Sequence, residues 1–430
     1  MSADISFNKL QVEGWRQFDA VDIDIHPKLT ILTGANGSGK STILNIFSTH
    51  FGWNRPLLGA PSLSKRGGYT YGMGLFKSLF SKLNSPKTQE HEQWAHVGRL
   101  EYSNNSASTL LIPKGSSAQY NIMMPSQQPV IGIHVDSYRP SPRYQQVPAI
   151  QMANIDAITA YNQYNHEIMN FFGGSTTGYS PVFRMKESLI TMALLGEGNK
   201  YLPGNSSLKK LFEGFDDILR KFLPDSIGFK EISIRVPDVV LITKSGNFMI
   251  DASSGGLMAL VDLAWRIYMF SQDKTSFVVT MDEPENHLHP SMQRSLIQRL
   301  ISAFPQAKFI IATHSPFIVS AVKDSYVYVL RYTIDQKISD SQDEAEVFGR
   351  KVISEKLDTI NKAGTAGDML REVLGVPVTM PEWVEHDIDN IIEKYRGKEI
   401  SVSLLASLRR DLNSVGFGEY YPSALASLSN

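Results

Sequence analysis

The sequence contains no cysteine, which excludes disulfide bonds and thiolate metal sites. It also lacks any run of the ~18 apolar residues that a membrane helix needs, since even the apolar stretch 309–312 is followed at once by Thr313 and His314. Neither sign of charge dominates, because 42 Lys and Arg face 43 Asp and Glu for a net charge of −1. No bulk positive charge draws the chain to nucleic acid or to a membrane, so such contacts would need a local patch.

The first twenty residues lack the apolar core of a signal peptide, because charged side chains interrupt them from Asp4 to Asp19. We therefore expect a cytoplasmic protein that does not enter a membrane. The length of 430 residues allows about three domains or one large α/β unit with insertions. The chain contains no internal repeat and no sustained heptads, which excludes a long-armed coiled-coil architecture.

Hydrophobic patterning predicts an α/β chain with a helical insertion. Strands are expected over 5–12, 21–25, 29–33, 129–135, 227–236, 239–243, 277–281, 309–312 and 326–331. Helices are expected over 41–51, 155–172, 185–195, 208–223 and 256–270. Units in which a strand precedes a helix are typical of a parallel sheet, so we predict a mixed, largely parallel sheet with antiparallel N-terminal strands.

The strongest motif lies between the third strand and the first helix. It is Gly34-Ala35-Asn36-Gly37-Ser38-Gly39-Lys40-Ser41, a full match to G-x-x-x-x-G-K-[ST]. Its glycines let successive backbone N–H groups point at phosphate oxygens, and the helix N-terminus adds positive charge. We expect Lys40 to reach the β and γ phosphates, Ser41 to bind Mg²⁺, and the nucleotide-binding segment to extend to Thr42.

Two later strand ends carry groups suited to phosphate chemistry. The strand 277–281 ends in Asp282-Glu283, a Walker B pattern in which Asp282 holds Mg²⁺ and Glu283 orients or deprotonates the attacking water. The next strand ends in Thr313-His314-Ser-Pro, which predicts His314 at the same edge, in reach of the γ-phosphate or that water. His287 and His289 beside Glu285 could form a zinc site, but we favour a loop entering a helix because further ligands are missing.

A second anion-binding device precedes the Walker B strand. Ser253-Ser254-Gly255-Gly256 opens a predicted helix, where hydroxyl and N–H groups can bind phosphate. Since the chain has one phosphate loop, this device most simply serves the nucleotide of another subunit. Taken alone, it is an ordinary helix cap.

Together, the phosphate loop, the Ser-Ser-Gly-Gly signature, the Asp-Glu-Pro-Glu strand end and the Thr-His-Ser-Pro segment resemble an ABC-type ATPase of the SMC/RecF/OLD-like group. The resemblance implies a P-loop NTPase fold, ATP hydrolysis with Mg²⁺, and a head-to-head homodimer in which ATP lies between the phosphate loop of one subunit and residues 253–256 of the other. Its nucleotide roles fall on Lys40, Ser41, Asp282, Glu283 and His314. We divide the chain into ATPase lobes over 1–150 and 226–335, a helical insertion over 151–225 and a helical tail over 336–430.

The sequence departs from the family pattern at three points. Ala252 stands where the family has leucine, so either Ser253 or Ser254 is the signature serine. The sequence does not identify the position of the family's glutamine loop, for which Gln127, Gln128 and the segment 137–139 are candidates. Arg16 either approaches the nucleotide or is an ordinary surface residue.

The compact architecture resembles ATPases of bacterial anti-phage defence pairs, so we expect a homodimeric sensor or scaffold that controls a separately encoded effector. A nuclease within the tail is disfavoured, because its one D-x-D, Asp387 and Asp389, falls on a predicted helix where the two side chains do not share a face. The alternative is a DNA-repair or DNA-end-binding ATPase. It depends on the stretch 55–99, which carries seven Lys or Arg against two Glu, with the aromatic residues Trp53, Tyr69, Tyr71 and Trp94 nearby.

Overall fold

The computed structural model describes most of the chain. The described residues are 4–63, 69–75, 93–115, 117–139, 143–150, 155–175, 177–334, 350–358, 365–374, 382–396, 398, 401–421, 424–425 and 428. They form two compact units, Met1–Met369 and Leu370–Asn430. None of the helices in this described part is long and apolar enough to cross a lipid bilayer.

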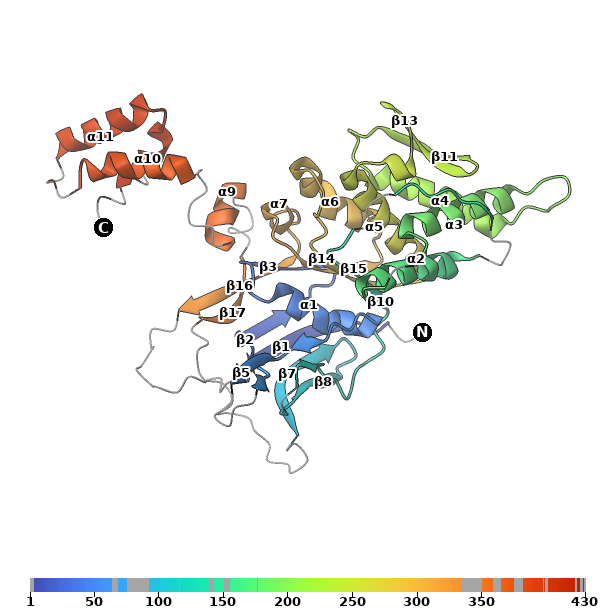
Figure 1. Cartoon of the computed structure of the whole chain (residues 1–430), viewed down its shortest axis with the longest axis horizontal. Coiled ribbons are helices and arrows are strands. Elements are labelled where there is room, and N and C mark those ends of the chain that lie inside the picture. Colours follow the sequence, from blue (N-terminus) through green and yellow to red (C-terminus); the bar gives the residue numbers. More distant parts are fainter. Residues whose placement is uncertain are drawn as a thin grey trace. The chain divides into compact units, whose positions relative to one another are not determined.

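A ten-stranded sheet organises the first unit, in the order β10-β14-β15-β3-β16-β17-β2-β1-β7-β8 (Figure 1). Its parallel half comprises β10 (Gly132–Val135), β14 (Phe277–Asp282), β15 (Ala307–Ala312), β3 (Leu29–Gly34) and β16 (Tyr326–Ile334). Its other half comprises β17 (Arg350–Lys356), β2 (Phe18–Asp24), β1 (Phe7–Trp15), β7 (Trp94–Tyr102) and β8 (Ala107–Pro113). The predicted α/β class with a mixed sheet is confirmed.

The central strands are buried on both faces. Every residue of β3 and of β14 is buried, which explains their continuous apolar sequences. The helix α1 (Lys40–Ser48) follows β3 and packs against the sheet with the buried side chains of Ile43, Leu44, Ile46 and Phe47. The core thereby fixes where β3 ends and α1 begins.

The helical insertion consists of α2 (Ala157–Phe172), α3 (Pro181–Glu197) and α4 (Ser206–Phe222). Each helix begins at a side chain that caps its N-terminus, namely Asp156, Ser180 and Asn205, and Pro181 lets α3 start four residues before the apolar pattern suggested. The three helices pack in sequence, and α2 and α4 both contact α5 (Gly255–Ser271), as the green and olive ribbons of Figure 1 show.

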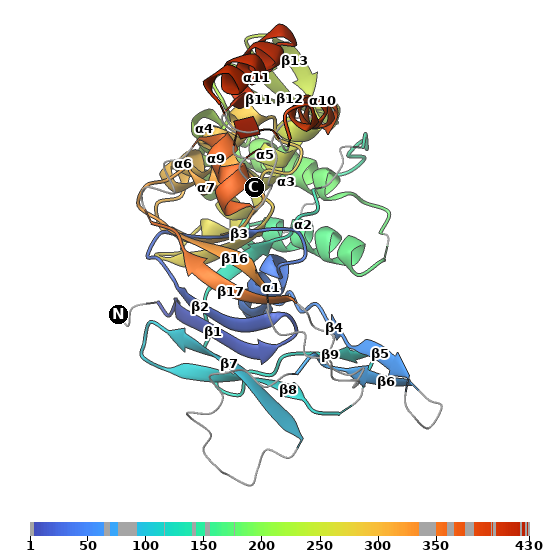
Figure 2. The same ribbon diagram turned by 90° about the vertical axis from the view of Figure 1, so that its left-hand side faces the viewer.

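Shorter elements complete the first unit. A three-stranded sheet consists of β11 (Phe229–Arg235), β12 (Asp238–Thr243) and β13 (Gly246–Met249). Two small ribbons pair β4 (Leu57–Leu58) with β9 (Gln119–Tyr120) and β5 (Ala60–Leu63) with β6 (Tyr69–Gly72) (Figure 2). Further helices in the described part of this unit are α6 (Pro290–Ala303), α7 (Pro316–Val319) and α9 (Ala366–Asp368), with short 3-10 turns at Thr49–Phe51 and Ile250–Ala252.

The strand β17 lies inside the segment 336–430, for which the sequence predicted a helical tail. It runs antiparallel to β16 and parallel to β2, and so joins the two halves of the main sheet. The side chain of Ser354 bonds both the N–H and the carbonyl of Asp22. Only Val352 and Ile353 are apolar in this strand, so its sequence gives little sign of it.

The second unit has a core of its own. It contains α10 (Glu382–Glu393) and α11 (Val402–Ser414), whose apolar faces meet around Leu408 and Leu412, both fully buried. Asp387 and Asp389 lie on α10, as predicted. These two carboxylates are two positions apart on one helix and therefore do not face each other.

Candidate nucleotide site

Three parallel strands, β3, β14 and β15, end at one edge of the sheet and carry the predicted phosphate loop, acidic pair and histidine. The register pairs Asp282 at the end of β14 with Ala312 of β15, and Ala312 with Leu32 of β3. The phosphate loop, the acidic pair and His314 therefore emerge side by side, the arrangement by which open α/β sheets build ligand sites.

The phosphate loop depends on its glycines. Gly34, Gly37 and Gly39 have φ of 136°, 78° and 96°, which L side chains rarely adopt. A Cβ at Gly34 would lie 2.5 Å from the carbonyl oxygen of Leu330, and one at Gly39 would lie 2.4 Å from the ring of Phe18. The loop is therefore clamped between β16 and β2, which holds its backbone in one shape.

Lys40, Ser41 and Thr42 form the first turn of α1, and no described side chain caps that turn. Its N–H groups are thus free for an anion. The ammonium of Lys40 donates to the carbonyls of Gly34 at 2.9 Å and Ala35 at 3.1 Å. Burial lowers the pKa of Lys40 to about 8, against the opposing attraction of Glu283 and Asp282.

The two predicted magnesium ligands meet although they lie far apart in the chain. The hydroxyl of Ser41 donates to Oδ1 of Asp282 at 3.2 Å. Burial raises the pKa of Asp282, whereas the hydrogen bond from Ser41 and the charge of Lys40 lower it. A hydroxyl and a carboxylate oxygen are ligands that suit Mg²⁺, so the donor set fits that ion.

Glu283 is held at four points. Its φ is 46°, an uncommon value outside glycine, and its N–H donates to the carbonyl of Ala312 at 2.8 Å. Its carboxylate lies 3.4 Å from Nε2 of His314 and accepts a hydrogen bond from Asn286 at 3.2 Å. Arg139 donates to its carbonyl at 3.4 Å. The sequence did not single out Asn286, whose role depends on the loop geometry.

His314 faces both Glu283 and Lys40. Burial and the nearby charge of Lys40 lower the pKa of His314, while Glu283 raises it. The imidazole is therefore uncharged at neutral pH.

Three residues after Glu283 lie in three different surroundings, two through their side chains and one through its backbone carbonyl. The carboxylate of Glu285 accepts hydrogen bonds from Thr313, His314 and Ser315. The carbonyl of His287 would lie 2.8 Å from a Cβ at Gly256, and His289 caps α6. Among the described residues, no group of three or more His, Cys, Asp or Glu side chains is placed to hold a metal ion.

The signature segment opens α5, as predicted. Ser254 is the N-cap residue and its hydroxyl oxygen accepts a hydrogen bond from the N–H of Leu257 at 3.3 Å. Gly255 and Gly256 form the first turn, and Ser253 is buried. Asp251 just before them is paired with the fully buried ammonium of Lys186 of α3, which also contacts Asp238 at 3.0 Å.

The candidates for the glutamine loop separate in the structure. Residues 137–139 follow β10 after one further residue, Asp136. Asn286 donates to the carbonyl of Ser137 at 3.1 Å, and Arg139 donates to the carbonyl of Glu283. Gln128 instead accepts a hydrogen bond from Asn104 and donates to Ser126. Only the segment 137–139 thus touches the Walker B strand end through these contacts.

Arg16 is half-buried in the turn between β1 and β2, and its N–H donates to the carbonyl of Gly74.

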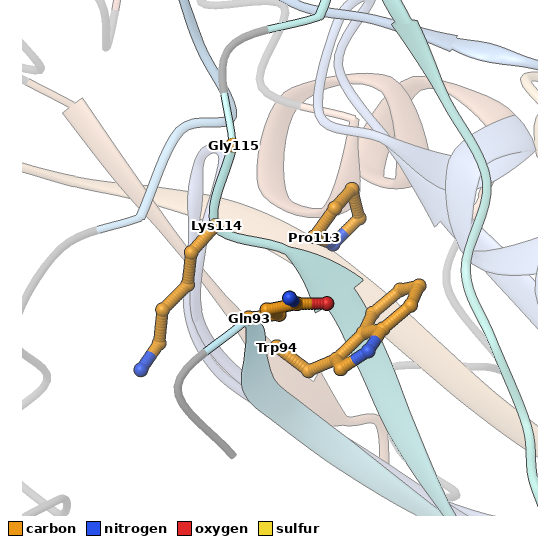
Figure 3. A pocket seen from close by; sticks show the side chains of 5 residues that line it. All are labelled: Gln93, Trp94, Pro113, Lys114 and Gly115. Carbon is orange, nitrogen blue, oxygen red and sulfur yellow. The ribbon is translucent and has the colours of Figure 1, made fainter.

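The described residues of the nucleic-acid alternative differ in their exposure. Of the seven Lys and Arg in the stretch 55–99, five lie outside the described residues, namely Lys65, Arg66, Lys77, Lys82 and Lys87. Trp53 is 2% exposed and cannot stack on a base, whereas Tyr69 on β6 is 71% exposed. Trp94 lines a hollow of about 480 Å³ between the start of β7 and the end of β8, together with Gln93, Pro113, Lys114 and Gly115 (Figure 3).

Two family models match the sequence. The AAA ATPase domain matches residues 184–319, from α3 through the signature, the Walker B strand and His314, and the AAA domain matches residues 9–84, which include the phosphate loop. The chain carries an ATPase domain. The predicted resemblance to an ATPase is thereby confirmed.

Several named relatives match part of this ATPase. A retron Ec83 probable ATPase of Escherichia coli is 28% identical over 31% of this chain and 26% of its own length. The Septu protein PtuA of Bacillus mycoides is 26% identical over 33% of this chain and 18% of its own, and PtuA of Bacillus thuringiensis is 25% identical over 38% and 41%. The chain thus spans between 18% and 41% of the length of these relatives.

Solved structures similar to this ATPase include SMC head domains. The SMC head domain from Thermotoga maritima aligns with a TM-score of 0.40 at 14% identity, covering 82% of this chain and 99% of its own. An SMC head with an extended coiled coil derived from Pyrococcus furiosus aligns with a TM-score of 0.42 at 14% identity, covering 86% and 99%.

Proposed function

We propose that this chain binds ATP with Mg²⁺ between two copies of itself and hydrolyses it, and that the resulting dimer controls a separate effector protein in anti-phage defence. The observation that carries the enzymatic part is the meeting of two pairs at one sheet edge: Ser41 with Asp282 at 3.2 Å and Glu283 with His314 at 3.4 Å. The ATPase family matches support the same reading.

Each residue at this edge has a role that its position supports. The loop N–H groups and Lys40 bind the phosphates, and Lys40 exchanges its two carbonyl acceptors for phosphate oxygens. Ser41 and Asp282 would hold Mg²⁺, and the ion would neutralise charge on the phosphates. Glu283 takes the proton of the attacking water, and the uncharged His314 orients that water or the γ-phosphate.

The signature segment serves the nucleotide of the second copy. The oxygen of Ser254 already accepts the N–H of Leu257, so its hydroxyl proton can be donated to a phosphate oxygen. The N–H groups of Gly255 and Gly256 add to this device. The hydroxyl of Ser253 is buried, which favours Ser254 as the signature serine.

The proposed role in defence depends on the relatives. Retron and Septu proteins are among the relatives, and each match covers only part of the relative. The identity of the effector and of its trigger therefore has to be found by experiment. The placement of Asp387 and Asp389 on one helix gives no support to a nuclease within the described part of the tail. We therefore assign the damaging activity to a separately encoded effector rather than to this chain.

The test is to isolate a Glu283→Gln variant from the organism that encodes the chain, in Mg²⁺ and ATP, and to measure the mass and content of the complex. Removing the base traps the ATP-bound dimer. A Lys40→Ala variant, which loses the phosphate contact, is the matched control and remains monomeric. A second protein that copurifies only with Glu283→Gln supports effector control.

Other outcomes decide against parts of the proposal. A dimer that copurifies with DNA but with no second protein would overturn the defence role and favour the DNA-repair alternative. The exposed Tyr69 is then the first candidate for a contact with a base. A monomer in both variants would exclude the ATP-sandwiched dimer. Robust cleavage of nucleic acid by the purified chain alone would exclude a separate effector.

A further inference from the structure

One oxygen of Glu285 collects three hydrogen bonds from the histidine segment. Its Oε1 accepts the hydroxyl of Thr313 at 2.5 Å and the N–H groups of His314 and Ser315, each at 3.1 Å. The residue is 8% exposed. Such bonds to a buried acceptor are costly to remove where the donor has no second partner. The N–H of Ser315 also donates to the hydroxyl oxygen of Thr313 at 2.9 Å, so the loss would fall mainly on Thr313 and His314.

The other oxygen has no such role. Oε2 of Glu285 is buried, and no described group bonds to it. The whole contact with residues 313–315 therefore passes through Oε1. An amide oxygen accepts hydrogen bonds in the same place, so a glutamine can reproduce this contact although it carries no charge.

The same short segment also carries the base. Glu285 lies two residues after Glu283, and the N–H of Glu283 is fixed to Ala312, the residue before Thr313. The two chain segments are thus tied together on both sides of the pair Glu283 and His314, which lie 3.4 Å apart. Further anchors hold the far side, since Thr33 donates to the carbonyl of Thr313 at 3.0 Å and Ser315 donates to Gln293 at 2.7 Å.

We propose that Glu285 is a positioning residue: through Oε1 alone it holds the backbone of His314 so that the imidazole faces Glu283, and its negative charge is dispensable for this. This inference deepens the proposed function and rests on it. Glu285 does not touch the reacting atoms. Its effect reaches them only through His314.

Four variants test the proposal: Glu285→Ala, Glu285→Gln, His314→Ala and the double variant Glu285→Ala/His314→Ala. We expect Glu285→Ala to lower kcat by about 30-fold or more with KM for ATP changed by less than about threefold, because ATP contacts other residues. Glu285→Gln should lose less than about fivefold. The double variant should be no slower than His314→Ala, because a residue that acts through His314 has nothing left to position.

A second measurement is independent of turnover. The pKa of His314 is followed by NMR on histidine-labelled wild type, Glu285→Ala and Glu285→Gln, with His314→Ala used to assign the signal and folding verified by circular dichroism. Releasing the segment in Glu285→Ala exposes the imidazole and moves its pKa toward 6.5, whereas Glu285→Gln leaves it lowered. If Glu285→Ala does not fold, Thr313→Val, which removes one donor to the same oxygen, should shift the pKa in the same direction.

The outcomes separate the two proposals. If the wild-type chain hydrolyses no ATP, the proposed function fails, and the pKa of His314 still decides whether Glu285 positions it. The inference is overturned if Glu285→Ala keeps wild-type kcat, if its defect multiplies with that of His314→Ala, or if the pKa of His314 does not move. If Glu285→Gln is as slow as Glu285→Ala, the charge is required and the inference is equally overturned.

Discussion

The carboxylate of Glu283 lies 3.4 Å from Nε2 of His314, although α6 and β15 separate the two residues in the chain. Both side chains are about one-third exposed, so they can reach a ligand as well as each other. The distance between Glu283 and His314 is set by the backbone hydrogen bond from the N–H of Glu283 to the carbonyl of Ala312 and by the hydrogen bonds that Glu285 accepts. A base and an uncharged imidazole are thus delivered together by two neighbouring strands.

Replacing His314 with alanine should lower kcat by about 100-fold, as the loss of a group that positions the water or phosphate does. The pKa of His314 is lowered by burial, so the imidazole becomes charged only as the pH falls below 6.5. The turnover of the wild type should therefore be constant above that pH and fall below it. The variant should not show this fall of turnover at acid pH. His386→Ala, at an exposed position on α10, serves as the control with wild-type kinetics. If the variant shows the same fall of turnover at acid pH, a group other than His314 causes it.

ATP binding should take up protons at alkaline pH. The pKa of Lys40 is about 8 without ligand, and phosphate oxygens near the ammonium raise it. At pH 8.5 the uptake should be between about half and one proton per site, measured by calorimetry in buffers of different ionisation enthalpy. Lys40→Arg, which stays charged, should bind ATP without this uptake. Equal uptake in both proteins would contradict the assignment to Lys40.

Removing Mg²⁺ should act through Ser41 and Asp282. Asp282→Asn should bind ATP about 10 to 100 times more weakly than wild type in Mg²⁺, because a carboxylate ligand is lost. In excess EDTA the two proteins should bind ATP alike. Ser41→Ala should show the same pattern with a smaller effect. Equal affinities in Mg²⁺ would exclude Asp282 as a ligand of the ion.

Lys186 should matter for stability although it lies outside every nucleotide motif. Its fully buried ammonium pairs with Asp251 and Asp238, so Lys186→Met leaves two carboxylates without their cation. We expect the free energy of unfolding in urea to fall by about 3–5 kcal/mol. Adding Asp251→Asn and Asp238→Asn should recover part of this loss. If the triple variant is less stable than Lys186→Met, the pairing is not the cause.

The contiguous motifs were found from the sequence, because a phosphate loop requires a fixed spacing of glycines, lysine and serine. The meeting of Ser41 with Asp282 followed from the rule that parallel strands end at one edge. The contacts of Lys186, Asn286 and Glu285 could not be predicted, since each depends on where the chain folds back rather than on local spacing. The strand β17 was missed because two apolar residues do not distinguish a strand from a loop.

The place of β17 also has a consequence for how the chain is made. The strands from β3 to β10 on one side and from β2 to β8 on the other are joined in the sheet only by β16 and β17. During synthesis, the ribosome produces β1, β2, β7 and β8 early, yet the strand that joins them to the half of the sheet with the nucleotide edge is complete only when residue 356 has been added. The nascent chain therefore holds two open sheet edges for most of its translation, and these edges are the surfaces that a chaperone would need to cover.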